Sequence, residues 1–393
     1  MSARLPVVPL SAFYFFYFAG LGGFMPYMGL YLQNHLGFSA EDIGQLLAFL
    51  MIARVIAPNF WGYLADRSGK RLAVVRFGGF MLTLFSLALM LPQGFWTLAF
   101  VLLGYSFFQS AIQAQFEAVT IAHLGARREL YSRIRLWGSV GFIVTGAVLG
   151  MLFDVVSVSW LPLCLMVCAL ANWLTSLRVP DIATRVRAAS HERLADILKR
   201  PAVAIFLVVH FLMQFSHAPY YSFFSIYLEG HGYARTTIGW MWSLAVFAEV
   251  VAFALMHRFL PRVGEKQVLM LCLLLGTLRW AVTAVSVDFP AVIWSVQLLH
   301  AATFAAFHAA SISFIYTHFG EGHQGQGQGL YSMLWGVGVA MGSWLTGMIW
   351  SAHESWAFLG AAVACAVAAL LLLRADFSLK AADEGGNVAR VVV

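Results

Sequence analysis

Four ionisable residues lie inside long apolar stretches of the chain. Arg54, Glu117, Glu249 and Arg279 are embedded in a sequence that is 61% hydrophobic and only 11% charged. A charge in hydrocarbon costs several kcal/mol, with about 2.5–3.5 kcal/mol as a low value at a helix centre, unless it faces a partner or a cavity. These residues therefore predict a polar, water-accessible route through a membrane protein.

The amino-acid composition indicates that membrane-spanning helices position these charges. A mean hydropathy of +0.79, with 33 Phe and 13 Trp, excludes an ordinary soluble domain. A helix that spans a bilayer needs about 20 apolar residues, and stretches of that length recur about twelve times. The sequence therefore predicts an all-α membrane protein with twelve transmembrane helices. We expect these helices over residues 8–33, 43–64, 73–91, 95–122, 135–154, 158–177, 202–228, 237–257, 267–287, 290–316, 328–350 and 354–373.

A polar and basic segment divides the spans into two groups of six. The expected parts are an N-terminal bundle over 1–179, a cytoplasmic linker over 180–200, a C-terminal bundle over 201–376 and a cytoplasmic tail over 377–393. A weak internal repeat supports two halves, because GYLADRSGKRL (62–72) matches RFLPRVGEKQV (258–268) in its basic residues and its glycine. Parallel halves with a site between them near the midplane are one arrangement that transporters use.

The charges are distributed asymmetrically across the predicted membrane. Of the 24 Lys and Arg residues, all but Arg54, Arg279 and Arg235 fall on one side. The connections on the other side carry acidic residues, namely Glu41, Asp42, Asp154, Glu229, Asp288 and Glu354. The positive-inside rule then places both termini in the cytoplasm. This pattern explains the net charge of +6 without nucleic acid. We expect a multi-pass protein of the cell (inner) membrane that works as a monomer.

No pattern in the sequence indicates a metal, a cofactor or a catalytic site. The four cysteines lie in apolar segments, form no zinc pattern and are expected to pack as small hydrophobic residues. GQGQG (325–329) lacks the Lys-Ser/Thr ending of a phosphate-binding loop. Paired aspartates, an H-E-x-x-H motif and a Ser/His/Asp arrangement are also missing, which disfavours an intramembrane enzyme or a sensor.

The segment GYLADRSGK (62–70) is the most specific local signal. Gly69 permits a tight turn after its helix. Asp66 lies near the end of that helix, where the dipole disfavours an acid, so we expect a specific partner for it. The segment resembles the loop signature of the major facilitator superfamily, and the resemblance implies that Asp66, Arg67 and Gly69 help to gate the cytoplasmic side. The alternative is a solvated loop.

A second resemblance begins at RIRLWGSVGF (133–142), one helix after Glu117. It resembles the corresponding stretch of the lactose permease group, in which a Glu and an Arg grip the substrate. It is closer still to the 3-phenylpropionate permease group. The shared segments are RLWGSV (135–140) and RW (279–280), and segments similar to those of the group are HAPYYSF (217–223), AEVVAFAL (248–255) and LHAATFAAFH (299–308). The resemblance implies that Glu117 and Arg135 contact substrate. Phe142 stands where the lactose permease group places a Trp against galactose, so a galactoside is less expected.

Physical chemistry is consistent with a substrate site at these residues. Glu117 and Arg135 can pair across adjacent antiparallel helices, and an arginine binds a carboxylate through two parallel hydrogen bonds. Gln113 shares a helix face with Glu117. A static salt bridge and a snorkelling Arg135 remain alternatives. His217 and Tyr221 are candidates for packing a phenyl ring, although such aromatic residues also serve as interface anchors or core packing.

Glu249, Arg279, His300 and His308 form the predicted proton-coupling set. The lactose permease group uses a Glu, an Arg and a His on the corresponding helices, so the resemblance implies this role for Glu249, Arg279 and His300. Histidine titrates in the useful range and can relay protons. Thr303 stands where that group has a second acid, which leaves Glu249 as the expected proton carrier. A structural ion pair and core histidines are the alternatives.

Together these features predict a secondary active transporter that works by alternating access. The leading hypothesis is proton-coupled import of a small organic acid, aromatic such as 3-phenylpropionate, with the proton and the substrate as its partners. The alternatives are an oligosaccharide or nucleoside proton symporter, and a multidrug or metabolite exporter.

Overall fold

The computed structural model describes residues 5–91, 94–125, 127–182, 194–320 and 323–377, and all regular elements in them are helical. The first half contains α1 (Val7–Leu30), α2 (Ala40–Ser68), α3 (Arg71–Ala88), α4 (Phe95–Leu124), α5 (Tyr131–Val155) and α6 (Leu161–Leu177). Short helical turns adjoin three of them, namely η1 (Tyr31–His35), η2 (Arg128–Leu130) and η3 (Val158–Trp160). A short helix α7 (Leu194–Leu198) precedes the second half.

The second half contains α8 (Pro201–Gly230), α9 (Arg235–Val263), α10 (Glu265–Val285), α11 (Pro290–Gln297), η4 (Ala301–Ala306), α12 (Phe307–His318), α13 (Gln324–Trp350) and α14 (Glu354–Leu373). Twelve helical stretches in the described residues are long and apolar enough to cross a membrane, which confirms the predicted number. The span expected over 290–316 is observed as one membrane-spanning stretch, Pro290–His318, in which the π-helical segment η4 lies between α11 and α12.

Polar caps set the ends of the helices beyond their apolar parts. At the start of α2, the Ser39 side chain accepts a hydrogen bond from the Asp42 backbone, and the Asp42 carboxylate accepts one from the Ser39 backbone. This capping box satisfies two backbone donors that lack helical partners. At the other end, Gly69 adopts the left-handed conformation at φ 65°, which confirms the turn expected there.

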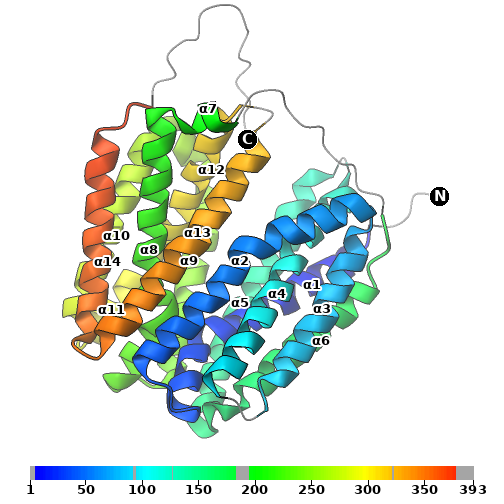
Figure 1. Cartoon of the computed structure of the whole chain (residues 1–393), viewed down its shortest axis with the longest axis horizontal. Helices are drawn as coiled ribbons and strands as arrows, with labels where there is room; N and C mark the ends of the chain where they lie inside the picture. The colour runs from blue at the N-terminus through cyan, green and yellow to red at the C-terminus, as the bar shows by residue number, and fades with distance from the viewer. Residues whose placement is uncertain (1–4, 92–93, 126, 183–193, 321–322, 378–393) are drawn as a thin grey trace, which may run out of the picture.

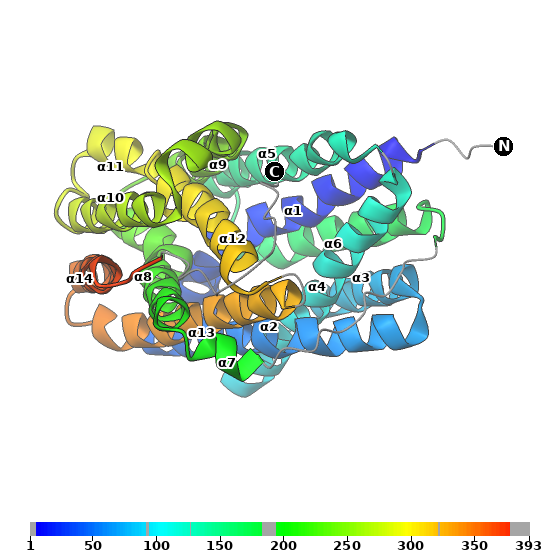
Figure 2. The ribbon, with the colours of Figure 1, turned by 90° about the horizontal axis from the view of Figure 1, so that it is seen from above.

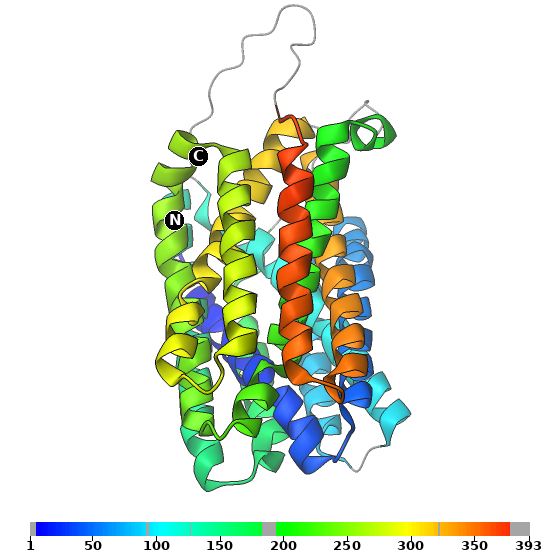
Figure 3. The same cartoon turned by 90° about the vertical axis from the view of Figure 1, so that its left-hand side faces the viewer.

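The helices pack in two groups that Figure 1 shows side by side. Helices α1 to α6 contact one another, and α8 to α14 contact one another. We call the end of the molecule at which α2 meets α3 the basic end, and the end at which α1 meets α2 the acidic end. Both described chain ends and α7 lie at the basic end, as Figures 1 and 3 show. The domain division at 180–200 stays a prediction, since 183–193 lie outside the described residues.

Two helix pairs form most of the contact between the halves. Helix α2 packs on α13, and α5 packs on α9, on opposite flanks of the molecule as seen from above in Figure 2. Glycines permit these close approaches. A Cβ added to Gly44 would lie 2.8 Å from Cα of Gly347, and one added to Gly239 would overlap the Gly146 carbonyl oxygen.

Polar contacts between the two halves lie at the acidic end. The Asp154 carboxylate of α5 accepts hydrogen bonds from the backbone N–H groups of Arg235 (2.8 Å) and Thr236 (3.1 Å), the first two residues of α9. The Arg235 side chain pairs with Glu229 at 2.6 Å, and Asn34 of η1 donates to the same carboxylate at 2.5 Å. The structure is therefore a conformation in which the two halves are joined at the acidic end, whereas their ribbons diverge towards the basic end (Figure 1).

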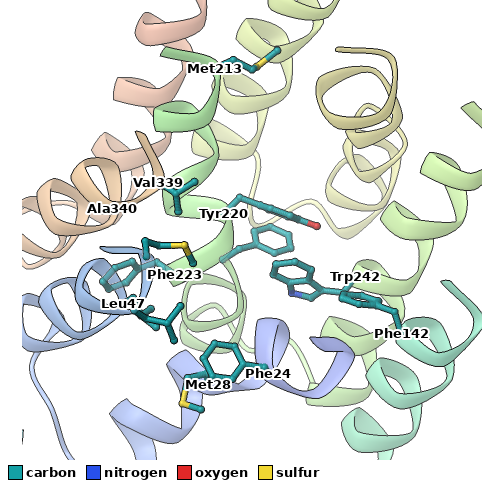
Figure 4. Close-up of a cluster of buried hydrophobic side chains, with 14 of the residues drawn as sticks. Phe24, Met28, Leu47, Phe142, Met213, Tyr220, Phe223, Trp242, Val339 and Ala340 are labelled. Atoms are coloured by element: carbon teal, nitrogen blue, oxygen red, sulfur yellow. The ribbon is translucent and has the colours of Figure 1, made fainter. Parts of the chain in front are cut away.

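A shared apolar core fills the middle of the molecule. Figure 4 shows buried side chains from both halves gathered there, among them Phe24 and Leu47 from the first half and Tyr220, Phe223 and Trp242 from the second. Arg279, His300 and Thr303 are buried within this apolar surrounding, so each of them needs a hydrogen-bond partner.

Candidate functional site

Three predicted coupling residues lie in direct contact in the second half. The Arg279 Nη1 group donates to Nδ1 of His300 at 2.7 Å, and Nε2 of His300 lies 2.7 Å from Glu249 Oε1. Because a guanidinium can only donate, Nδ1 of His300 must be an acceptor, and the neutral ring then carries its proton on Nε2. His300 therefore donates to the Glu249 carboxylate and links it to Arg279.

Thr303 extends this cluster to His217. The Thr303 hydroxyl accepts from Arg279 Nη1 at 2.9 Å and lies 3.2 Å from Nε2 of His217. Nδ1 of His217 lies 2.8 Å from the Met213 carbonyl, which can only accept, so the neutral ring leaves Nε2 to accept from Thr303. Thr303 stands where the lactose permease group has an acid. Its hydroxyl accepts a hydrogen bond from Arg279 and donates one to His217.

The members of this cluster differ in their access to solvent. Arg279 is fully buried, and its guanidinium carbon lies 4.5 Å from the Tyr220 ring and 4.3 Å from the Trp280 ring. The His300 side chain is 4% exposed, whereas that of Glu249 is 14% exposed. Glu249 is therefore the least buried of these three residues, while Arg279 is held in place by aromatic rings and hydrogen bonds.

In the first half, Glu117 of α4 and Arg135 of α5 form the expected ion pair. Arg135 Nε lies 3.5 Å from Glu117 Oε1, and both side chains are about one third exposed or less. The Arg135 guanidinium carbon lies 4.2 Å from the Phe18 ring and 5.3 Å from the Tyr14 ring of α1. The pair lies towards the basic end of its helices, where partly exposed charges remain accessible to a ligand.

The polar face of α4 continues towards the centre of the molecule. Gln113 accepts a hydrogen bond from Tyr17 at 3.3 Å, and Gln109 accepts one from Arg54 at 2.9 Å. Arg54 lies near the middle of α2, and its guanidinium carbon lies 5.5 Å from the ring of Trp335 on α13. Trp335 was not among the predicted site residues, because one Trp in an apolar helix has no sequence signature that separates contact with a cation from packing.

The remaining predicted binding residues lie in different surroundings. Tyr221 lines a pocket between α1, α2 and α8, and its ring lies 5.6 Å from His217. Phe142 is 8% exposed and belongs to the apolar core. His308 donates or accepts a hydrogen bond with the Tyr331 hydroxyl at 2.8 Å, away from Glu249 and Arg279. Sequence reasoning placed His217 with the substrate and His308 with the coupling set, whereas the contacts place His217 in the cluster of Arg279.

The predicted gating residues lie at the basic end of α2. Asp66 forms an ion pair with Arg71 of α3, which supplies the specific partner that its position at a helix C-terminus requires. Arg71 also donates to Gln115 of α4 at 2.6 Å. Arg67 donates to the Tyr63 hydroxyl one turn earlier at 2.8 Å. This segment therefore connects α2, α3 and α4 within the first half.

The sequence from residue 7 to residue 359 matches the family model described as the MFS_1 like family. The chain belongs to this family of transporters. It is 28% identical over 311 residues to the probable 3-phenylpropionic acid transporter of Escherichia coli, which covers 78% of this chain and 81% of that protein. It is 25% identical over 280 residues to the maltose permease of Geobacillus stearothermophilus, with 71% of each chain covered.

The fold of this transporter is similar to that of solved transporter structures. A mutant of the nucleoside transporter NupG superposes with a TM-score of 0.83 over 93% of this chain and 98% of that chain, at 18% sequence identity. The similarity shows a shared fold. This protein is thus a multi-pass membrane transporter of the major facilitator type and not an enzyme.

Proposed function

We propose that this transporter imports a small organic acid together with a proton, and that the acid is aromatic, such as 3-phenylpropionate. The contact between Glu249, His300 and Arg279 carries the proposal. A carboxylate inside the membrane is stable when it is either paired or protonated, so a change in its partners changes its affinity for a proton. The named activity of the Escherichia coli relative supports the choice of substrate.

The arrangement of hydrogen bonds indicates how proton binding would be coupled to substrate. With Glu249 ionised, it accepts from His300, which in turn is held by Arg279. Protonation of Glu249 removes its negative charge. Its attraction to Arg279 and its hydrogen bond with His300 then weaken, which frees the cluster to reorganise. Because Thr303 and His217 continue the cluster towards Tyr221 and the space between the halves, a ligand there would sense the change.

Electrostatics favours coupling of an anionic substrate to a proton. Moving one charge through a membrane potential involves about 2.3 kcal/mol per 100 mV. An organic anion entering a cell with a negative interior would have to overcome this cost. A carboxylate that crosses with one proton is electrically neutral, so the potential does not oppose it and the pH gradient drives it.

Purified protein in liposomes tests the proposal. We expect labelled 3-phenylpropionate to accumulate when the lumen is made alkaline relative to the outside, and a protonophore to abolish the accumulation. Uptake that proceeds at the same rate without a pH gradient and in the presence of the protonophore would exclude proton coupling.

The maltose permease among the relatives makes a sugar substrate the second candidate. Competition experiments separate the two, because unlabelled aromatic acids should reduce uptake of the labelled acid, whereas maltose and nucleosides should not. Uptake of a labelled sugar that aromatic acids fail to reduce would instead favour the second candidate. Preferential movement of the acid out of vesicles against its gradient would indicate export.

A further inference from the structure

Arg54 has a cationic side chain near the middle of the membrane-spanning part, with only neutral partners. Its Nη2 group donates to Gln109 Oε1 at 2.9 Å, and the face of Trp335 lies 5.5 Å from its guanidinium carbon. Within the described ranges, no carboxylate lies within 4 Å of it. A guanidinium has five N–H groups, and a single amide oxygen satisfies only one of them.

Arg135 and Arg279, the two arginines of the predicted substrate and coupling sites, have acidic partners. Arg135 pairs directly with Glu117, and Arg279 is connected to Glu249 through His300. An uncompensated cation at this depth is costly, so it must be solvated by water or by an anion. Arg54 is partly exposed, so protein atoms do not cover its side chain completely.

We infer that Arg54, with Gln109, Tyr17 and Trp335 around it, is the site at which the carboxylate of the transported substrate binds. This inference deepens the proposed function, on which it rests for the identity of the substrate. It assigns the carboxylate to Arg54 of α2 in place of Arg135. Arg54 has free donors arranged as a planar fork, which matches the two oxygens of a carboxylate.

Both halves of the molecule contribute to the surroundings of Arg54. Gln109 and Tyr17 come from α4 and α1, and Tyr17 also contacts Gln113. Trp335 comes from α13 in the other half. A carboxylate bound here would therefore lie between the halves, at the place where alternating access requires a substrate to lie.

An apolar pocket adjoins Arg54 towards the acidic end. Its lining includes Leu47 and Met51 of α2, Met28 of α1 and Tyr221 of α8. Met51 precedes Arg54 by three residues on the same face of α2, which corresponds to a rise of about 4.5 Å. The pocket therefore begins within one helical turn of Arg54, so the apolar part of a substrate whose carboxylate is bound to Arg54 would face it. The pocket is only large enough for about one water molecule in this conformation, so the flexible methionine side chains must move to admit a phenyl ring.

The same neighbourhood connects the anion site to the coupling cluster. The Trp335 ring lies 6.4 Å from the Tyr221 ring, and Tyr221 lies 5.6 Å from His217. His217 contacts Thr303, which contacts Arg279. Binding at Arg54 can therefore alter the packing around the proton-binding residues through a continuous set of side chains.

Binding measurements with charged and neutral ligands test the inference. The probes are 3-phenylpropionate and benzoate, each paired with its neutral amide, titrated into the full-length protein in detergent by calorimetry. We expect wild type to prefer each acid to its amide. Arg54→Gln should reduce affinity for the acids by about thirtyfold or more, as expected for loss of one partner of a buried charge pair, and leave the amides nearly unchanged.

Three further variants separate a direct contact from a general defect. Arg54→Lys keeps the charge but loses the fork, so it should retain part of the preference for acids. Arg135→Gln should keep the preference if Arg54 holds the carboxylate. The exposed Arg133, two residues from Arg135, provides the matched control Arg133→Gln, which should bind as wild type does.

The outcomes distinguish this inference from the proposed function. A preference for acids that survives Arg54→Gln and Arg54→Lys, or that disappears in Arg135→Gln, overturns the inference. A wild-type protein that binds acids and amides equally also overturns it. If the preference depends on Arg54 but liposomes show no proton-driven uptake of 3-phenylpropionate, the anion site stands and the proposed transport reaction is wrong.

Discussion

The hydrogen bonds between Asp154 and the start of α9 lead to a quantitative prediction about opening at the acidic end. Asp154 belongs to the first half and accepts from two backbone N–H groups of the second half, at 2.8 and 3.1 Å. It acts as an N-terminal cap for α9, supplied by another helix, and its charge also interacts favourably with the helix dipole. Separation of the halves at this end must break both hydrogen bonds.

Replacing Asp154 by Ala should therefore favour the conformation that is open at the acidic end. Loss of a helix N-cap costs about 0.5–2 kcal/mol, and this cost applies only to the conformation in which the cap is formed. Since about 1.4 kcal/mol corresponds to a factor of ten, the open fraction should rise about 2- to 30-fold while the closed form still predominates. Asp154→Asn retains an acceptor oxygen and should give a smaller increase.

Thiol labelling measures this change. A cysteine is placed at Leu47, a buried residue of the pocket next to the acidic-end contacts, in a protein whose four native cysteines are replaced by serine. Because the acidic end is predicted to face outward, right-side-out vesicles are treated with a membrane-impermeant maleimide. The labelling rate is compared between the parent protein carrying Leu47→Cys and the same protein carrying Asp154→Ala. Asp288→Ala removes an exposed carboxylate from the connection between α10 and α11 and serves as the control. Equal labelling rates in the Asp154→Ala variant and its parent, with both folded, would refute the reasoning.

Three other substitutions give further tests. Glu249→Gln should abolish substrate uptake driven by a pH gradient, because the amide cannot take up a proton; normal gradient-driven uptake would reject Glu249 as the coupling acid. Thr303→Val should lower stability by about 1–3 kcal/mol, because Arg279 loses an acceptor and His217 loses a donor. An unchanged melting temperature of the detergent-solubilised protein would argue against these hydrogen bonds. Gly44→Leu should raise labelling from the acidic end, because its Cβ alone would lie 2.7 Å from the Ser343 carbonyl oxygen. Labelling that stays at the parental rate would show that α2 and α13 do not separate in transport.

The sequence predicts the helices of this protein well because the membrane imposes a simple requirement on each span. The last helix was expected over 354–373 and is observed over Glu354–Leu373. The second was expected over 43–64, yet it extends over Ala40–Ser68, because a capping box and a left-handed glycine fix its ends outside the apolar part. Hydropathy predicts the part of a helix that lies in the hydrocarbon region, whereas backbone hydrogen bonds determine the residues at which the helix begins and ends.

The π-helical segment η4 shows where such prediction stops. Its apolar composition differs little from that of an α-helix, so the sequence over 290–316 indicates one continuous helix. The local change to the wider winding of a π-helix accompanies the contacts of His300 and Thr303 with Arg279 on another helix. These contacts join segments that are distant in the sequence, so they could not be predicted from the sequence of this span alone.

The same distinction explains which site residues were predictable. A charge inside an apolar span has a high free-energy cost in the membrane and is therefore rare. For this reason Arg54, Glu249 and Arg279 could be identified from the sequence alone. Whether each charge has a counter-charge depends on packing between helices, and the structure makes the three unequal: Arg279 is tied to Glu249 through His300, while Arg54 has neutral partners. A carrier of an anion and a proton needs one cation that is free to receive the anion and one acid that is free to receive the proton. In the proposed transport reaction, Arg54 of the first half would receive the anion and Glu249 of the second half would receive the proton, so each half supplies one of the two binding groups and symport requires both halves.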